Sequence, residues 1–222
     1  RALLSAGALL YVSAQGWTLY YGDAQAHLNI ARRLVDSRQP GYEQLGTVWL
    51  PLPHLLMLPF TLIDSWWRSG IAGAIPAALC FTLGGWFLFQ ATKRIFHSSA
   101  PAAAALAAYA LNPNLLYLQS TPMTESMALC CALGLLYACA IFRDTRRPAA
   151  AFLAGLIACG GTLTRYEAWF LLPFVAGFFL LYGGETRWRS ALGFSLIAAL
   201  GPLYWLAHNA YLYSAPLEFY NG

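Results

Sequence analysis

The sequence predicts an all-α polytopic membrane protein with about seven transmembrane helices, and its composition is the first reason. Hydrophobic residues make up 59% of the 222 residues, charged residues only 10%, and the mean hydropathy is +0.53. Soluble domains carry roughly 25% charged residues. A soluble chain of this size exposes too large a surface to hide so much apolar area, whereas in a bilayer apolar side chains can face lipid.

Seven apolar runs are the candidate membrane spans. They cover residues 2–20, 69–91, 101–118, 127–142, 149–163, 168–183 and 190–212. Several are shorter than the roughly 20 residues that a straight span needs, so flanking polar residues must complete them. An odd number of spans places the two ends of the chain on opposite sides of the membrane.

The one long gap, residues 21–68, predicts two juxtamembrane helices. Residues 23–38 place their apolar side chains on one helical stripe, which is typical of an amphipathic helix in the membrane interface, with Asp23 as its N-cap. Three charged residues of this helix are expected to face mostly away from the stripe: Arg32, Arg33 and Asp36. Residues 39–47 form a loop. Residues 48–63 are apolar but contain three prolines, which favours a short helix or re-entrant element over a straight span.

The basic residues of the gaps predict the orientation. Eight lie on one side, namely Arg1, Lys93, Arg94, Arg143, Arg146, Arg147, Arg187 and Arg189. Five lie on the other, namely Arg32, Arg33, Arg38, Arg68 and Arg165. Because cytoplasmic loops carry the excess of Lys and Arg, the first set is expected to be cytoplasmic. Residues 21–68 then face outward, and we expect a bacterial inner (plasma) membrane protein with its site on the extracytoplasmic side.

The acidic residues show a separate asymmetry. Seven are expected outside, namely Asp23, Asp36, Glu43, Asp64, Glu125, Glu167 and Glu218, and only Asp144 and Glu185 inside. Asp23, Glu125 and Glu167 each stand at the outer end of an apolar run, where a carboxylate is costly and is usually functional or paired. Packed helix ends would bring them to one cavity. A structural role stays open for each alone, since Asp23 can cap a helix and the helix dipole favours glutamate in a first turn.

Three further residues are candidates for the same cavity. His27 follows Asp23 by four residues, so both can lie on one helical face; it either takes part in a site or is a hydrogen-bonded helical histidine. His54 lies just after the second of two closely spaced prolines and is a further candidate. Arg165 either binds a lipid phosphate, whose geometry arginine matches, or anchors the chain in the interface. Whether the site holds a divalent cation is open, the candidate ligands being Asp23, Glu125 and Glu167.

Other partners and cofactors are limited by composition. The five cysteines all lie in apolar runs without C-x-x-C spacing, which is typical of small buried hydrophobes. No lysine-rich stretch accompanies the net charge of +4, so we expect membrane lipids and not nucleic acid as partners. The chain starts at Arg1 inside an apolar run and ends without a recognisable element, so residues 1–222 are expected to be a single transmembrane module, the N-terminal part of a longer protein.

The order of these features resembles the membrane glycosyltransferases of the GT-C superfamily. The closest likeness is to bacterial family-39-like enzymes, related to protein O-mannosyltransferases and lipid A aminoarabinose transferases. The resemblance rests on an acid after the first run, in Tyr-Gly-Asp23-Ala-Gln-Ala-His27, and on a long outer loop containing Gly46-Thr-Val-Trp-Leu-Pro-Leu-Pro-His54. Short outer loops with Glu125 and with Thr164-Arg165-Tyr166-Glu167 complete it. It covers nearly the whole chain.

This resemblance implies a mannosyltransferase-like transfer of a sugar from a polyprenyl phosphate to an acceptor hydroxyl, with inversion. Asp23 would be the general base and Arg165 would stabilise the leaving phosphate. Glu125 and Glu167 would position the sugar, the acceptor or a divalent ion, and His27 and His54 complete the expected substrate-binding set. Asp23 is followed by alanine where many protein O-mannosyltransferases have a second acid, and Glu125 stands alone where oligosaccharyltransferases have two acids. The acceptor is therefore left open.

Two other function classes stay open. Charges within a membrane protein also mark transport paths, so a transporter or lipid flippase is one alternative. The charges here gather at one membrane face, however, and no inverted repeat is visible. A non-catalytic membrane subunit is the other alternative.

Overall fold

The computed structural model describes residues 2–221, which form helices and no strand, so the all-α fold class is confirmed. Arg1, one of the basic residues used to predict the orientation, lies outside the described residues. The α-helices are α1 (Ala2–Ala14), α2 (Gly22–Arg33), α3 (Leu52–Thr61), α4 (Asp64–Ser69), α5 (Ile71–Phe96), α6 (Ser99–Ala110), α7 (Pro113–Leu118), α8 (Glu125–Thr145), α9 (Pro148–Thr162), α10 (Glu167–Tyr182), α11 (Arg187–Ala198) and α12 (Leu200–Tyr213). Short 3-10 turns lie at Tyr42–Leu45, Gly184–Thr186 and Glu218–Tyr220.

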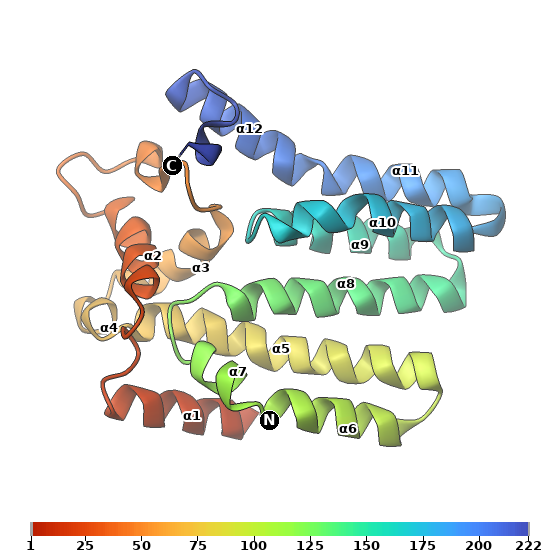
Figure 1. The fold of residues 1–222 in the computed structure, drawn as a ribbon, viewed down its shortest axis with the longest axis horizontal. Helices are drawn as coiled ribbons and strands as arrows, with labels where there is room; N and C mark the ends of the chain where they lie inside the picture. The colour runs from red at the N-terminus through yellow and green to blue at the C-terminus, as the bar shows by residue number, and fades with distance from the viewer. Residues whose placement is uncertain (1, 222) are drawn as a thin grey trace.

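The long helices run side by side, and α2, α3 and α4 gather at one end of them (Figure 1). Each apolar run of the sequence contains a helix, but the lengths differ from expectation. Three helical stretches are long and apolar enough to cross a membrane by themselves, namely Ile71–Phe96, Glu125–Thr145 and Gly184–Tyr213. The others, α1, α6, α9 and α10, have 12 to 16 residues.

The run 101–118 is two helices and not one span. The Asn112 side chain accepts hydrogen bonds from the backbone N–H groups of Asn114 and Leu115, and Pro113 occupies the first position of α7. Asparagine at the N-cap and proline at the first helical position are strong start signals, so a new helix begins here.

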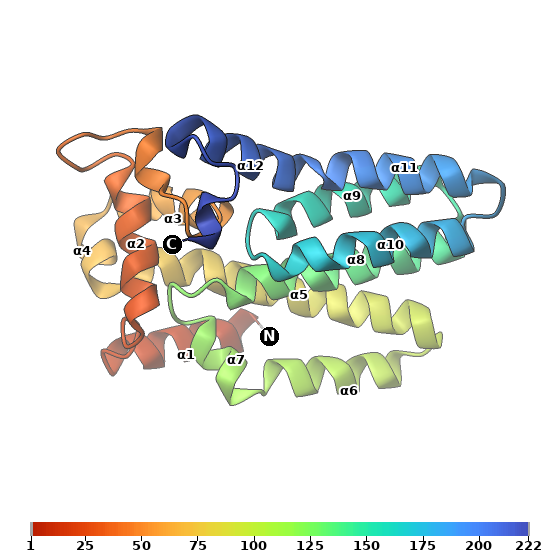
Figure 2. The same cartoon turned by 45° about the horizontal axis from the view of Figure 1, so that its top comes forward.

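Helices α8, α9, α10 and α11 pack together as one group (Figure 2). Their shared core consists largely of alanine and phenylalanine, including the fully buried Ala138, Phe142, Phe179 and Phe194. Small residues allow helix backbones to approach closely, which drives helix association where lipid offers no hydrophobic advantage. At Gly155 of α9 an added Cβ would lie 3.0 Å from the carbonyl oxygen of Phe194, so α9 and α11 are in close contact.

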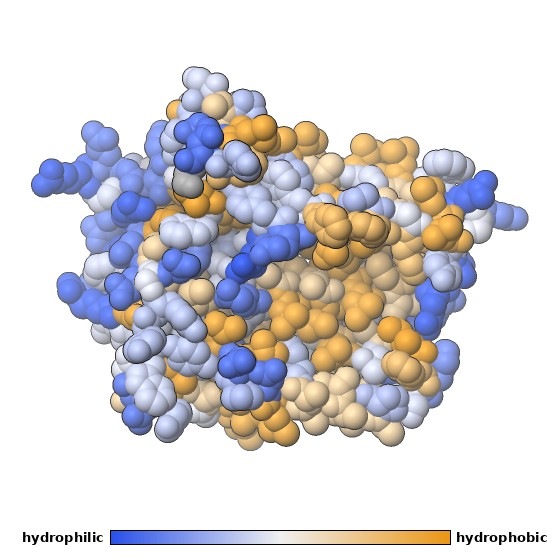
Figure 3. All heavy atoms as spheres, viewed as in Figure 1, coloured by the Kyte–Doolittle hydropathy of each residue, from blue (hydrophilic) through white to orange (hydrophobic). Residues whose placement is uncertain are grey.

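Hydrophilic residues cover the two ends of the molecule, and hydrophobic residues cover the surface between them (Figure 3). One end carries α2, α3 and α4, and the other carries the turns α5–α6, α8–α9 and α10–α11 (Figure 1). This distribution is that of an integral membrane protein. It also places the predicted basic and acidic loops at opposite ends of the helices.

Helix α2 differs from the predicted interfacial helix in two ways. It ends at Arg33, not at residue 38, because Val35 beyond it is 44% exposed and adds nothing to the apolar stripe. Asp23 is not the N-cap: Tyr21 takes that position without a side-chain cap, and Asp23 lies in the first turn. The Asp23 carboxylate is therefore not used to start the helix. The predicted stripe itself is present, since Ala24, His27, Leu28 and Ala31 are all buried.

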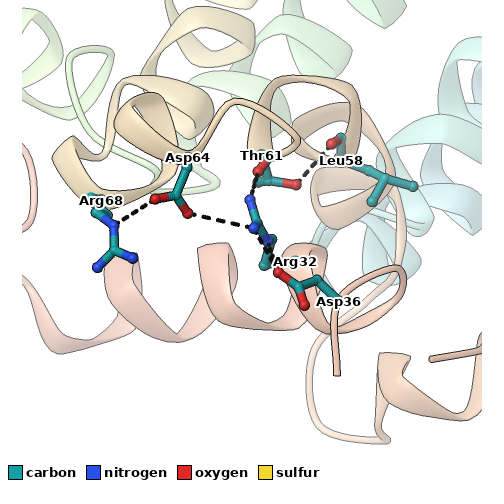
Figure 4. Close-up of polar contacts among 6 residues, drawn as sticks. All are labelled: Arg32, Asp36, Leu58, Thr61, Asp64 and Arg68. Carbon is teal, nitrogen blue, oxygen red and sulfur yellow. Dashed lines mark hydrogen bonds and ion pairs between the residues drawn. The ribbon is translucent and has the colours of Figure 1, made fainter. Parts of the chain in front are cut away.

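Arg32 joins α2 to the next two helices instead of facing away from the fold (Figure 4). Its guanidinium donates hydrogen bonds to the Thr61 carbonyl oxygen at the end of α3 and to Asp36, and it lies 3.5 Å from Asp64 of α4. Asp64 also pairs with Arg68 at 2.7 Å. A carbonyl at a helix end has no partner within its helix, so Arg32 supplies the missing donor.

Candidate functional site

A cavity of about 410 Å³ opens where α2, α8 and α10 begin. Five of the charged and polar residues singled out in the sequence line it, namely Asp23, His27, Glu125, Arg165 and Glu167. They come from three separate parts of the chain and share one wall only because the helix ends are packed together. Three carboxylates face one guanidinium, so the cavity has an excess of negative charge.

Glu125 is the first residue of α8, and a tight contact just before it in the chain fixes its position. Gly73 of α5 lies so close to Pro122 that an added Cβ would overlap the proline. This contact fixes the segment that leads into α8 against α5. Glu125 and Glu167 each occupy the first turn of a helix, as the sequence predicts, where the helix dipole stabilises a negative charge.

Arg165 lies between the two glutamates. Its Nη1 is 2.8 Å from Glu125 and its Nη2 is 3.0 Å from Glu167, and the same guanidinium donates to the Thr124 hydroxyl. These carboxylates, above all Glu167, raise the pKa of Arg165. A guanidinium has five N–H donors, and the bonds to Glu167, Glu125 and Thr124 occupy Nε, both hydrogens of Nη1 and one of Nη2. One Nη2 donor is left for a ligand.

The loop before α3 forms the opposite wall through Val48, Trp49 and Leu50. Two hydrogen bonds hold it to the segment between α9 and α10: the Tyr166 hydroxyl donates to the Val48 carbonyl at 3.1 Å, and the Leu52 N–H donates to the Leu163 carbonyl at 3.0 Å. Trp205 of α12 in turn donates to the Tyr166 hydroxyl at 2.8 Å. The middle of the Gly-Thr-Val-Trp-Leu-Pro segment, Val48 to Leu50, is therefore held in place as part of the cavity wall.

His27 and His54 form a buried pair, in which His27 lines the cavity and His54 lies behind His27. The Nδ1 atom of His27 lies 2.9 Å from the Nε2 atom of His54, and the Trp49 ring lies 4.9 Å from the His27 ring. Burial lowers the pKa of His27, and it lowers the pKa of His54 to about 3, so both rings are neutral at pH 7. His54 is fully buried and does not line the cavity, whereas His27 does.

A second hollow, about 550 Å³ in volume, adjoins the first. Apart from Glu125, Arg165 and Glu167, nearly all of its lining is apolar and comes from α7, α8, α9 and α10, including Leu129, Leu135, Ile157 and Phe170. Glu125, Arg165 and Glu167 line both spaces. The charged cluster thus stands at the junction between a polar cavity and an apolar groove.

The carboxylates considered as metal ligands do not form a metal cluster. Among residues 2–221 no three His, Cys, Asp or Glu side chains lie close enough to share an ion. Arg165 occupies the space between Glu125 and Glu167 and already neutralises part of their charge. The described residues therefore do not fit a divalent cation held by Asp23, Glu125 and Glu167.

Several lining residues were not singled out in the sequence. Trp49 and Tyr166 lie in the two segments that carry the family resemblance, and only their sequence neighbours indicated that they are near the site. Thr124 precedes Glu125 and binds Arg165, which a polar residue before a helix could have suggested. Phe219 stacks on Tyr166 with ring centroids 4.9 Å apart, and no sequence pattern predicts this contact between distant segments.

Comparison with known proteins gives one family. The family described as dolichyl-phosphate-mannose-protein mannosyltransferase matches residues 51–208 of this chain. The matched range contains Glu125, Arg165 and Glu167, while Asp23 and His27 lie before it. No curated protein matches the chain, and no solved structure does.

Proposed function

The chain belongs to the dolichyl-phosphate-mannose-protein mannosyltransferase family, and from this membership we propose that it transfers a sugar from a polyprenyl phosphate to an acceptor hydroxyl. The match covers most of the chain and confirms the resemblance to GT-C membrane glycosyltransferases. We further propose that the donor is a lipid phosphate, that the site faces the extracytoplasmic side of the membrane, and that individual residues have the roles given below.

One observation carries the proposal: an apolar groove and an acidic cavity meet at Arg165. A polyprenyl-phosphate sugar has the same order of parts, an apolar tail, a phosphate and a polyol head. The tail fits the groove between α8 and α10, and the sugar fits the cavity. The phosphate then lies at the free Nη2 donor of Arg165, and arginine suits phosphate because its charge is permanent and its donors are planar.

In the proposed reaction the Asp23 carboxylate accepts the proton of the acceptor hydroxyl. The hydroxyl oxygen forms a bond to C1 of the sugar while the bond from C1 to the phosphate oxygen breaks, so the configuration at C1 inverts. The phosphate leaves with the electron pair of that bond, and Arg165 stabilises its developing charge. Glu125 and Glu167 hold the guanidinium in place and offer acceptors to the sugar hydroxyls.

The basic loops support a cytoplasmic location for the end opposite the cavity, by the excess of Lys and Arg in short loops. On this assignment the cavity faces the extracytoplasmic side of a bacterial inner membrane. The lipid donor reaches the groove laterally from the bilayer, and the acceptor enters from the aqueous side.

Replacement of Asp23 by asparagine tests the assigned base. Asp23→Asn keeps the shape of the side chain but removes the proton acceptor, so transfer from a radiolabelled polyprenyl-phosphate sugar in membranes should fall about 100-fold to 10,000-fold. Glu43→Gln is the matched control, because Glu43 is exposed at the same end and does not line the cavity. Near-normal transfer by Asp23→Asn contradicts the role. Movement of the intact lipid without chemical change, by the unmodified protein in liposomes, would instead favour a flippase.

A further inference from the structure

The His27–His54 pair has one unusual atom at each end. The Nδ1 atom of His54 is buried without a hydrogen-bond partner among the described residues. The Nε2 atom of His27 also has no partner among the described residues, but it is not fully buried, and His27 lines the cavity. Only the inner pair of nitrogens, 2.9 Å apart, is bonded.

This arrangement decides which nitrogens carry protons. A neutral imidazole has one N–H donor and one acceptor nitrogen, so exactly one of the two bonded nitrogens carries the shared hydrogen. If His27 donated through Nδ1, the proton of His54 would be on its buried Nδ1, which has no acceptor. Orphaned buried N–H donors are rare, while under-satisfied acceptors are tolerated more often. The lower-energy arrangement therefore has His54 donating from Nε2 to Nδ1 of His27.

We infer that His54 holds His27 in the tautomer with a proton on Nε2, so that His27 presents an N–H donor to the cavity and is not a base. His54 is a positioning residue that does not touch the substrate, and His27 donates to a substrate oxygen. Which substrate carries that oxygen rests on the proposed function: a sugar hydroxyl or a phosphate oxygen of the donor offers the lone pair required.

The surroundings of His27 agree with a neutral ring. Asp23 stands one turn earlier on α2, and Glu125 and Arg165 face His27 across the cavity. Burial outweighs the two carboxylates and lowers the His27 pKa, so the ring does not become a cation at pH 7. The two side chains on α2 thus have different roles: Asp23 accepts a proton, and His27 donates a hydrogen bond.

Nitrogen NMR of the histidine rings tests the tautomer directly. The protein has four histidines, so long-range ¹⁵N–¹H spectra of ¹⁵N-histidine-labelled protein in nanodiscs can be assigned by single replacements. We expect His27 to show a protonated Nε2 and an unprotonated Nδ1 at pH 7. A proton on Nδ1, or on both nitrogens, overturns the inference. Because the measurement needs no substrate, its result tests this inference independently of the glycosyltransferase proposal.

Two replacements of His54 separate positioning from packing. His54→Gln keeps an N–H donor near the Nε2 position and should leave the His27 tautomer unchanged. His54→Leu removes the donor and should give a mixture of both His27 tautomers. If His27 keeps a single, unchanged tautomer in His54→Leu, the role of His54 is overturned. If His54→Leu does not fold, the decisive result is that of His54→Gln. Loss of the Nε2-protonated form of His27 in folded His54→Gln also overturns the role of His54.

Activity then tests the donor role of His27. His27→Leu should raise the KM for the polyprenyl-phosphate sugar about tenfold, the effect of one lost hydrogen bond, and His27→Gln should restore most of it. The acidic limb of the pH–rate profile should persist in His27→Gln, since His27 is not the base. Loss of that limb in this variant overturns the inference. If no polyprenyl-phosphate sugar is a substrate of the unmodified protein, the proposed function fails while the tautomer result still decides this inference.

Discussion

Two regions of this membrane protein differ in the interactions that stabilise each of them. The group α8–α11 packs through a buried cluster made largely of alanine and phenylalanine, and Gly155 allows α9 and α11 to approach closely. The end formed by α2, α3 and the starts of α8 and α10 is held by directional contacts instead, such as His27–His54, Arg32–Thr61 and Tyr166–Val48. Shape alone suffices where the helices only have to associate. Side chains that must meet in a fixed geometry require hydrogen bonds.

After the Asp23 replacement, the largest expected effect concerns Arg165, whose guanidinium contacts Thr124, Glu125 and Glu167 at the polar end. Arg165→Met removes the proposed phosphate donor and should lower kcat/KM about 100-fold to 1,000-fold. Arg165→Lys should recover only part of this, because lysine lacks the planar fork. Arg189→Met, at an exposed position in the opposite basic region, is the control. Full activity of Arg165→Lys would show that charge alone is needed.

Overpacking of the α8–α11 group should lower the stability of the protein without changing the geometry of the site. Gly155→Leu forces a side chain against α11 and should lower the free energy of unfolding by about 1–3 kcal/mol, measured by thermal unfolding in detergent. Gly177→Leu in α10 is the matched control, because nothing lies within 4 Å of an added Cβ there. Transfer activity per folded molecule should be the same in both variants. A stable Gly155→Leu protein would show that α9 and α11 do not approach as closely as described.

The histidine pair should make the polar end sensitive to acid. Folding lowers the His54 pKa from 6.5 to about 3, so its contribution to stability is complete above pH 6.5 and is lost as the pH falls. At pH 5 the loss should be about 2 kcal/mol relative to pH 7. His54→Gln should remove this part of the pH dependence in thermal unfolding, whereas the exposed His97→Gln should not. Equal pH dependence in all three proteins would argue against a neutral buried His54.

The smallest expected effect concerns Arg32. Arg32→Met leaves the Thr61 carbonyl without its donor and should lower the free energy of unfolding by about 1 kcal/mol. Arg33→Met, the neighbouring exposed residue of α2, should have little effect on thermal unfolding. If the two variants are equally stable, the link from α2 to α3 and α4 contributes nothing measurable.

The sequence-based prediction of this end was right for the starts of α8 and α10 and wrong for the N-cap and the end of α2. Glu125 and Glu167 were placed at the starts of their helices because a polar residue before a long apolar run is a strong signal. The end of α2 was placed five residues too far along, since Val35 fits the apolar stripe by spacing but has no packing partner. Spacing shows which residues can share a face, not whether another helix covers that face.

The histidines illustrate the same limit at the site. His27 and His54 were both expected to bind substrate, from their positions near Asp23 and among prolines. The structure places one on the cavity wall and the other behind it, 2.9 Å away. Nothing in the spacing of the chain distinguishes the two. The difference depends on how α2 crosses α3.

By itself the sequence determined the membrane environment, the helical class, the family likeness and the gathering of acids at one end. These properties follow from composition and from the order of apolar and charged segments, which are local along the chain. Only the tertiary structure decided that Asp23, Glu125, Arg165 and Glu167 share one cavity, that an apolar groove joins it, and that His54 stands behind His27. These facts depend on how helix packing brings together residues up to 144 positions apart in the sequence, as Asp23 and Glu167 are, and no local segment carries a signature of that packing.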